Sequence, residues 1–66
     1  MKNGKWIVSV QDEHGEWWPL KGEYDTPAPE DGGTPEMVIE EERKAAKPEG
    51  IVYEDGTIRA DWKEED

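Results

Sequence analysis

The chain contains no cysteine, no phenylalanine and a single histidine, His14, among its 66 residues. Without cysteine there is no disulfide, and one histidine cannot make a structural zinc site, which normally takes four cysteine or histidine ligands. Small scaffolds usually depend on one of these two devices, because a chain of this length buries only about 60% of its unfolded surface. We therefore expect the four tryptophans and two tyrosines to supply most of the stabilising mass.

Long apolar runs are also missing. The longest are Ile7-Val8 and Met37-Val38-Ile39, far short of the roughly 20 residues that a membrane-spanning helix needs. No apolar signal core follows the first five residues. We therefore expect one small domain over residues 1–66 that is soluble, cytoplasmic and monomeric on its own.

Basic residues are scarce. Eight lysines and arginines stand against eighteen aspartates and glutamates, for a net charge of −10. A field of this sign repels nucleic acid and anionic membranes and attracts basic surfaces, although it would also simply keep a small protein in solution. The charge predicts a protein partner with a basic or mixed surface, and no direct binding of nucleic acid or membranes.

Residues 5–24 are expected to form a β-hairpin, because apolar and polar residues alternate on both sides of the Asp12–Gly15 turn signal. A three-residue loop over residues 13–15, with Gly15 at positive φ, is a common hairpin geometry. A two-residue loop would split the apolar residues between the two faces. Pro19 has no N–H to donate, so its strand should have an exposed edge. The expected register pairs Val10 with Trp18, Val8 with Leu20, and Trp6 with Gly22, whose bare backbone the Trp6 ring can cover.

Two segments are expected to connect this hairpin to the rest of the chain. Residues 25–33 are rich in proline, glycine and acids, which predicts a mobile loop that buries nothing. Residues 34–47 are expected to form a helix, with Thr34 as N-cap and Pro35 at the first helical position. Acidic residues precede basic ones along this segment, an order that suits the helix dipole. The β-branched pair Val38-Ile39 leaves a strand over residues 37–42 as the alternative.

Residues 50–63 are expected to form a second hairpin around an Asp55-Gly56 turn. This turn pairs Tyr53 with Ile58 and Ile51 with Ala60. Residues 64–66 are expected to be a frayed acidic tail. The predicted fold is therefore α+β, a small antiparallel sheet of two hairpins with one helix between them (ββαββ); the alternative is a small all-β, barrel-like fold. The predicted core comprises Trp6, Val8, Val10, Trp18, Leu20, Tyr24, Val38, Ala45, Ile51, Tyr53, Ile58, Ala60 and Trp62.

No residue set in the sequence supports catalysis. With one histidine and no cysteine, nucleophilic triads and zinc hydrolase sites cannot be assembled. Paired carboxylates are plentiful, but glycosidase-type chemistry needs a cleft that raises the pKa of one of them. The acidic runs also lack the spacing of a calcium loop. We expect no enzymatic activity, no metal and no other cofactor.

Trp17 is the residue with the clearest interaction character. If Trp18 faces the core, Trp17 faces the opposite side of the sheet, which a single helix layer leaves open, and tryptophan is enriched at binding hot spots. Alternatively, Trp17 covers the sheet or belongs to the core of a barrel-like packing. The predicted partner-binding residues are Trp17, Ile7, Pro19, Val52, Glu16 and Glu23.

The sequence predicts a non-enzymatic, acidic interaction module, which includes the possibility of an inhibitor or a nucleic-acid mimic that binds a basic protein surface. An alternative origin fits the same residues. Capping and turn residues agree with one another as in designed proteins, for example Thr34-Pro35-Glu36 and Asp55-Gly56. Under that hypothesis the chain is a de novo designed scaffold or binder with no natural function.

Overall fold

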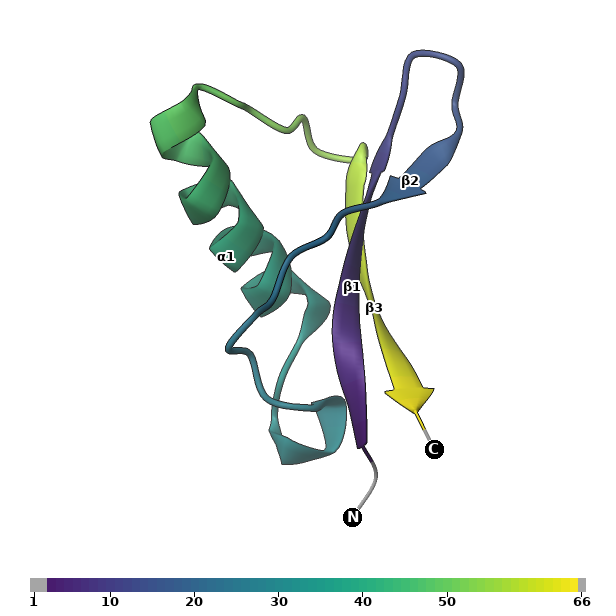
Figure 1. Ribbon diagram of the computed structural model, residues 1–66, viewed down its shortest axis with the longest axis vertical. Coiled ribbons are helices and arrows are strands. Elements are labelled where there is room, and N and C mark those ends of the chain that lie inside the picture. The colour runs from purple at the N-terminus through teal and green to yellow at the C-terminus, as the bar shows by residue number, and fades with distance from the viewer. Residues whose placement is uncertain (1–2, 66) are drawn as a thin grey trace.

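The computed structural model describes residues 3–65, which form three strands and one α-helix (Figure 1). The elements are β1 (Asn3–Gln11), β2 (Trp17–Pro19), α1 (Pro35–Ala46) and β3 (Ile58–Glu65), with short 3-10 helices at Pro29–Asp31 and Lys47–Glu49. The strands form one antiparallel sheet in the order β2-β1-β3, and α1 covers one face. The expected α+β class is confirmed. The barrel-like alternative is wrong, because residues 37–42 are helical.

The first hairpin has the expected register. Val10 lies opposite Trp18 in the β1–β2 ladder, and the Leu20 amide donates a hydrogen bond of 2.8 Å to the Val8 carbonyl. Pro19 sits on an edge strand, as its missing N–H requires. The chain then leaves the sheet, so the predicted pairing of Trp6 with Gly22 is absent from the ladder.

The loop of this hairpin also follows the prediction. The Asp12 amide donates to the Glu16 carbonyl at 2.8 Å, which closes a loop over residues 13–15. Gly15 takes a φ of 83°, the left-handed conformation that this loop needs. Local sequence chemistry therefore determines this turn.

The predicted second hairpin is wrong. Residues 51–57 contain no strand, and β3 pairs with β1 instead, with Ile58 opposite Val10 and Trp62 opposite Trp6. The order ββαββ is therefore not formed. This pairing places Ile58 and Ala60 beside the buried Val8. A separate hairpin would not bury these two residues against β1.

The Asp55-Gly56 turn nevertheless exists. The Thr57 amide donates to the Glu54 carbonyl at 3.1 Å, and Gly56 has a φ of 85°. Asp55 does not take positive φ, whereas the common two-residue hairpin turns need positive φ at the first central residue. The turn thus reverses the chain direction, but its backbone lacks the twist of a tight hairpin turn. The segments before and after it therefore do not pair with each other.

The predicted acidic tail is also wrong in part. Glu64 and Glu65 belong to β3, opposite Gly4 and Asn3, while Asp66 lies outside the described residues. Across residues 3–65, no helix is long and apolar enough to cross a membrane.

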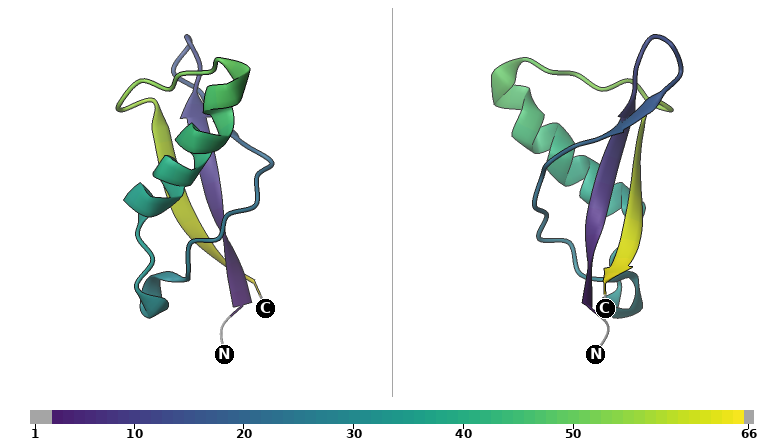
Figure 2. Two further views of the ribbon diagram at one scale, coloured as in Figure 1. Left: turned by 90° about the vertical axis from the view of Figure 1, so that its left-hand side faces the viewer. Right: turned by 45° about the vertical axis from the view of Figure 1, so that its right-hand side comes forward.

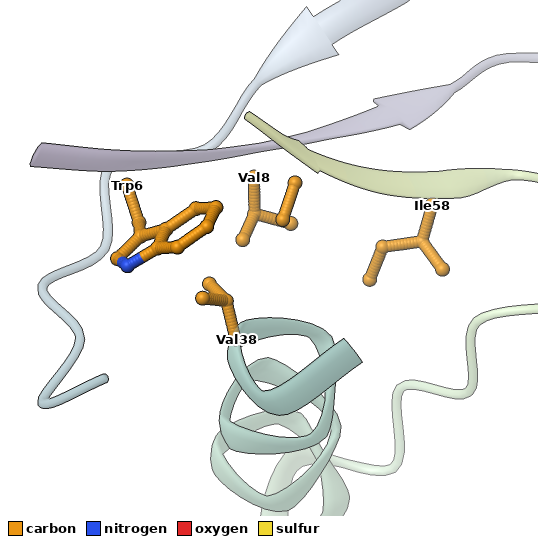
Figure 3. Close-up of a cluster of buried hydrophobic side chains, with 5 residues drawn as sticks. Trp6, Val8, Val38 and Ile58 are labelled. Atoms are coloured by element: carbon orange, nitrogen blue, oxygen red, sulfur yellow. The ribbon is translucent and has the colours of Figure 1, made fainter. Parts of the chain in front are cut away.

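The core lies between α1 and the sheet, where Val38 of α1 points toward Trp6 and Val8 of β1 (Figure 3). Its buried members are Trp6, Val8, Val38, Ile58 and Ala60, and the predicted core residues that pack against it at partial burial are Val10, Leu20, Tyr24, Tyr53 and Trp62. Trp18, Ala45 and Ile51 were predicted to be core residues but are exposed, and Ala46 is buried instead of Ala45.

Trp6 connects this core to the loop of residues 25–33. Its indole Nε1 donates to the Pro27 carbonyl at 2.9 Å, and its ring meets Trp62 edge-on at a centroid distance of 5.5 Å. Gly33 is buried against the same carbonyl, where an added Cβ would lie only 1.8 Å from the Pro27 oxygen. Glu41 of α1 accepts hydrogen bonds from the Thr26 hydroxyl and amide. The prediction that this loop buries nothing is therefore wrong.

α1 begins as predicted, with the Thr34 hydroxyl accepting a hydrogen bond from the Met37 amide at 3.3 Å and Pro35 at the first helical position. The helix is closest to the sheet at this end and moves away toward its C-terminal end (Figure 1). Glu42 lies in the widening part, where its carboxylate accepts hydrogen bonds from the hydroxyls of Tyr24 and Tyr53 at 2.8 and 3.3 Å. Burial and this carboxylate raise the pKa of both tyrosines.

We predict that Trp6→Ala lowers the free energy of unfolding by about 3–5 kcal/mol, the usual cost of removing a buried large aromatic. Trp18→Ala is the matched control. Trp18 is 54% exposed, so its loss should cost about 2 kcal/mol, the usual value of a hydrogen bond to a charged group, and clearly less than that of Trp6. Urea unfolding followed by circular dichroism compares the two variants. Equal destabilisation would show that Trp18 belongs to the core after all.

Candidate functional site

The sheet face turned away from α1 carries part of the predicted site. Alternation along the strands places Ile7, Trp17 and Pro19 together on this open face. Its charged residues are Lys5, Arg59, Asp61, Lys63 and Glu65. Three of these five are basic, so the open face is not the acidic surface that the sequence predicted.

Trp17 already has a partner within the molecule. The Arg59 guanidinium lies over its ring at 4.3 Å from the centroid, a cation–π contact that spans β1. Ser9, which lies between these two side chains on β1, is buried at 9% exposure. Trp17 is therefore only half exposed. This arrangement matches the alternative in which Trp17 covers the sheet.

The other predicted site residues lie elsewhere. Val52 is not on a strand but in the segment that links the 3-10 helix Lys47–Glu49 to β3. Glu16 is exposed at the end of the hairpin loop, and Glu23 is exposed in the coil after β2, beside Lys5 and Trp6. The six predicted residues do not form one surface.

A different apolar surface is exposed on the helix side of the sheet. We call it the hairpin-end patch and define it as Val10, Trp18, Ile51 and Val52. Trp18 is 54% and Val52 86% exposed. Trp18 lies opposite Val10, and Val10, Ile51 and Val52 line one shallow hollow. None of the described residues that line this hollow belongs to α1, and α1 moves away from the sheet toward its C-terminal end (Figure 1).

Asp12 holds Trp18 in place within this patch. Its carboxylate accepts a hydrogen bond of 2.8 Å from the Trp18 indole, and others of 2.8 and 2.9 Å from the amides of His14 and Glu16. The indole hydrogen bond, followed by that of the Glu16 amide, lowers the pKa of Asp12 below its ordinary value. The exposed ring is thus held in one orientation by the hairpin itself.

The surroundings of the patch are acidic. Asp12, Glu13 and Glu54 line the hollow, and none of its described lining residues is a lysine or an arginine. His14 lies exposed in the hairpin loop, with its Nε2 at 3.6 Å from the Glu13 carboxylate. Within residues 3–65, no three histidine, aspartate or glutamate side chains gather so that they could hold a metal ion. The patch is therefore apolar in the centre, with negative charge at the rim.

This patch was not predicted, because Trp18 and Ile51 were assigned to the core. The difference in length between the helix and the first strand could have revealed it. α1 has 12 residues and spans about 18 Å, whereas β1 has nine and spans about 30 Å. A helix of this length cannot cover the whole sheet, so one end of the sheet has to stay exposed.

We predict that the indole Nε1–H resonance of Trp18 titrates with an inflection below pH 3.9, the usual pKa of aspartate. The pKa of Asp12 is lowered in the folded protein, so its hydrogen bonds stabilise the hairpin above that pH and are lost as the pH falls through the lowered value. Nuclear magnetic resonance measures the shift directly. Asp12→Asn, which keeps an acceptor oxygen, should abolish the inflection. An inflection at or above pH 3.9 would contradict the arrangement.

The chain was compared with protein-family models, curated proteins and solved structures. No protein-family model, no curated protein and no solved structure matches it. The function proposed below therefore rests on the exposed, apolar and acidic residues of the hairpin-end patch.

Proposed function

We propose that the protein is a non-enzymatic interaction module that binds a basic protein surface through the hairpin-end patch. One observation carries this proposal: Trp18 is exposed and yet held in a fixed orientation by Asp12. An indole that is more than half exposed adds little apolar surface to the core. A pre-oriented tryptophan is instead typical of a binding hot spot.

Exposed apolar neighbours extend the contact that Trp18 can make. Val52 is 86% exposed, Ile51 is exposed, and both lie along the same hollow as Val10. Apolar residues at the centre and polar residues at the rim are the usual anatomy of a protein interface. The hairpin-end patch has this arrangement on a small scale.

Charge supports a basic partner. The acidic rim of Asp12, Glu13 and Glu54 adds to a net charge of −10, which accelerates encounter with a positive surface. The open face is a weaker candidate, because its tryptophan already stacks on Arg59 and most of its charges are basic. The proposal therefore keeps the predicted kind of partner and moves the binding site from Trp17 to Trp18.

A cationic, amphipathic helical peptide is a suitable probe, since its backbone hydrogen bonds are satisfied internally and only its side chains can bind. We expect its addition to 15N-labelled protein to shift the resonances of Val10, Asp12, Val52 and the Trp18 indole. Trp18→Ala should weaken binding at least about tenfold, because truncation of a hot-spot aromatic typically costs 2 kcal/mol or more. Raising salt from roughly 50 to 500 mM should slow association, because the Debye length falls several-fold.

Trp17→Ala is the matched control, since it removes the same side chain from the opposite face. It should leave the dissociation constant of the peptide within about twofold of the wild-type value. A loss of binding in Trp17→Ala with retention in Trp18→Ala would overturn the proposal and assign the site to the open face. Shifts spread evenly over all acidic residues would indicate nonspecific charge attraction and would also contradict it.

A further inference from the structure

β3 lies at one edge of the sheet. Among residues 3–65, the order β2-β1-β3 places no strand on the outer side of Ile58, Ala60 and Trp62. The Gln11 amide donates to the carbonyl of Thr57, its opposite residue in the β1–β3 register, at 2.8 Å. In an antiparallel ladder the residues that bond to the neighbour alternate along the strand. The backbone groups of Arg59 and Asp61 therefore point toward β1, and those of Ile58, Ala60 and Trp62 point outward.

A groove runs beside the first part of this edge. It lies between α1 and the start of β3, and its lining residues are Glu36, Ile39, Glu40, Arg43, Asp55, Gly56 and Ile58. In the left view of Figure 2, α1 crosses the sheet with its N-terminal turns on the β3 side. The groove and the outward backbone groups of β3 thus lie next to each other, at Ile58.

The walls of the groove differ in chemistry. Ile39 and Ile58 supply apolar surface, while Glu36 and Glu40 are exposed one helical turn apart on α1. Of the described residues that line the groove, Arg43 alone is basic, and it is already engaged. Its guanidinium donates to the Tyr53 carbonyl at 2.6 Å and to the Asp55 carboxylate at 2.9 Å. The charge that remains for a ligand is negative.

We propose that an extended peptide segment of another protein adds to the outer edge of β3 and places an apolar side chain, flanked by lysine or arginine, in this groove. The backbone of the peptide bonds to the outward groups of Ile58, Ala60 and Trp62, as in strand addition to an open sheet edge. Its apolar side chain packs between Ile39 and Ile58. Its basic side chains reach Glu36 and Glu40.

Charge decides between a foreign peptide and a second copy of this chain. Two copies carry −10 each and would bring the acidic walls of two grooves toward each other, which like-charge repulsion opposes. A basic segment removes that repulsion. The site is separate from the hairpin-end patch, so this proposal does not depend on the proposed function.

The probe is the peptide acetyl-Thr-Lys-Thr-Val-Thr-Lys-Thr-amide, in which valine and both lysines share one face of an extended strand. We expect titration into 15N-labelled protein to shift and protect the amides of Ile58, Ala60 and Trp62. The glutamate analogue of the peptide should not bind. Glu40→Lys should weaken binding at least about fivefold through loss of an ion pair and gain of repulsion. Glu23→Lys, the same change of charge on a coil beside the other edge of the sheet, should have little effect.

Backbone methylation provides the sharper test. In antiparallel addition, the peptide residues whose side chains face the groove also direct their N–H groups to β3. N-methylation of valine and both lysines should therefore weaken binding at least about tenfold, whereas N-methylation of three of the threonines should be tolerated. Equal effects of these two isomers, which carry three N-methyl groups each, would overturn strand addition.

Two further outcomes separate the proposals. Binding of this peptide should be unchanged in Trp18→Ala, and a loss there would place the peptide on the hairpin-end patch and refute the groove. Spectra of the protein alone at rising concentration provide the last control. If the amides of Ile58, Ala60 and Trp62 become protected without peptide, the edge pairs with a second copy, and the proposal of a foreign segment is wrong.

Discussion

The contacts of one side chain, Trp6, connect most parts of this molecule. Its ring is buried against Val38 of the helix and meets Trp62 of the third strand. Its indole nitrogen donates to the Pro27 carbonyl and so attaches the long acidic loop to the core. In a chain without disulfides or a described metal cluster, a large aromatic with one polar group can fill the core and fix a loop together. The buried Gly33, on the other side of the same carbonyl, shows how closely that loop is packed.

The same contact explains why the sheet is covered unevenly. Trp6 and Val38 hold the N-terminal end of α1 close to the sheet, and the helix then diverges from it. Tyr24 and Tyr53 fill the widening space by sharing the Glu42 carboxylate. Beyond them the sheet has no cover. Uneven coverage therefore leaves both the hairpin-end patch and the groove beside β3 open, with Glu54 and Thr57 lining one hollow and Asp55 and Gly56 lining the other.

Local chemistry made part of this fold predictable. The register of Val10 with Trp18 follows from a three-residue loop with Gly15 at positive φ, and the start of the helix follows from Thr34 and Pro35. The partner of β3 was not predictable in this way. Ile51 and Tyr53 alternate as well as Ile58 and Ala60 do, so the pattern fits a local hairpin equally well. Packing against β1, a contact far away in the sequence, decides between the two pairings.

The sequence predicted an exposed tryptophan but chose Trp17, whereas Trp18 is the more exposed of the two. The net charge and the exposed tryptophan were visible in the sequence, whereas the choice between Trp17 and Trp18 depends on where the helix stops covering the sheet. Arg59 adds to this, because its position over Trp17 requires β3 to lie beside β1. No spacing along the chain indicates that contact.

The separation of charge between the two faces gives the molecule an electric dipole moment as well as a net charge. Lysine and arginine make up three of the five charged residues on the open face, while the charged residues that line the hollow at the hairpin end are all acidic. In the electric field of a positively charged partner, the protein would rotate before contact until the hairpin-end patch points toward the partner and the open face points away from it. The random orientational search that limits most association rates is then shortened, at low ionic strength, by the arrangement of charges on a sheet only three strands wide.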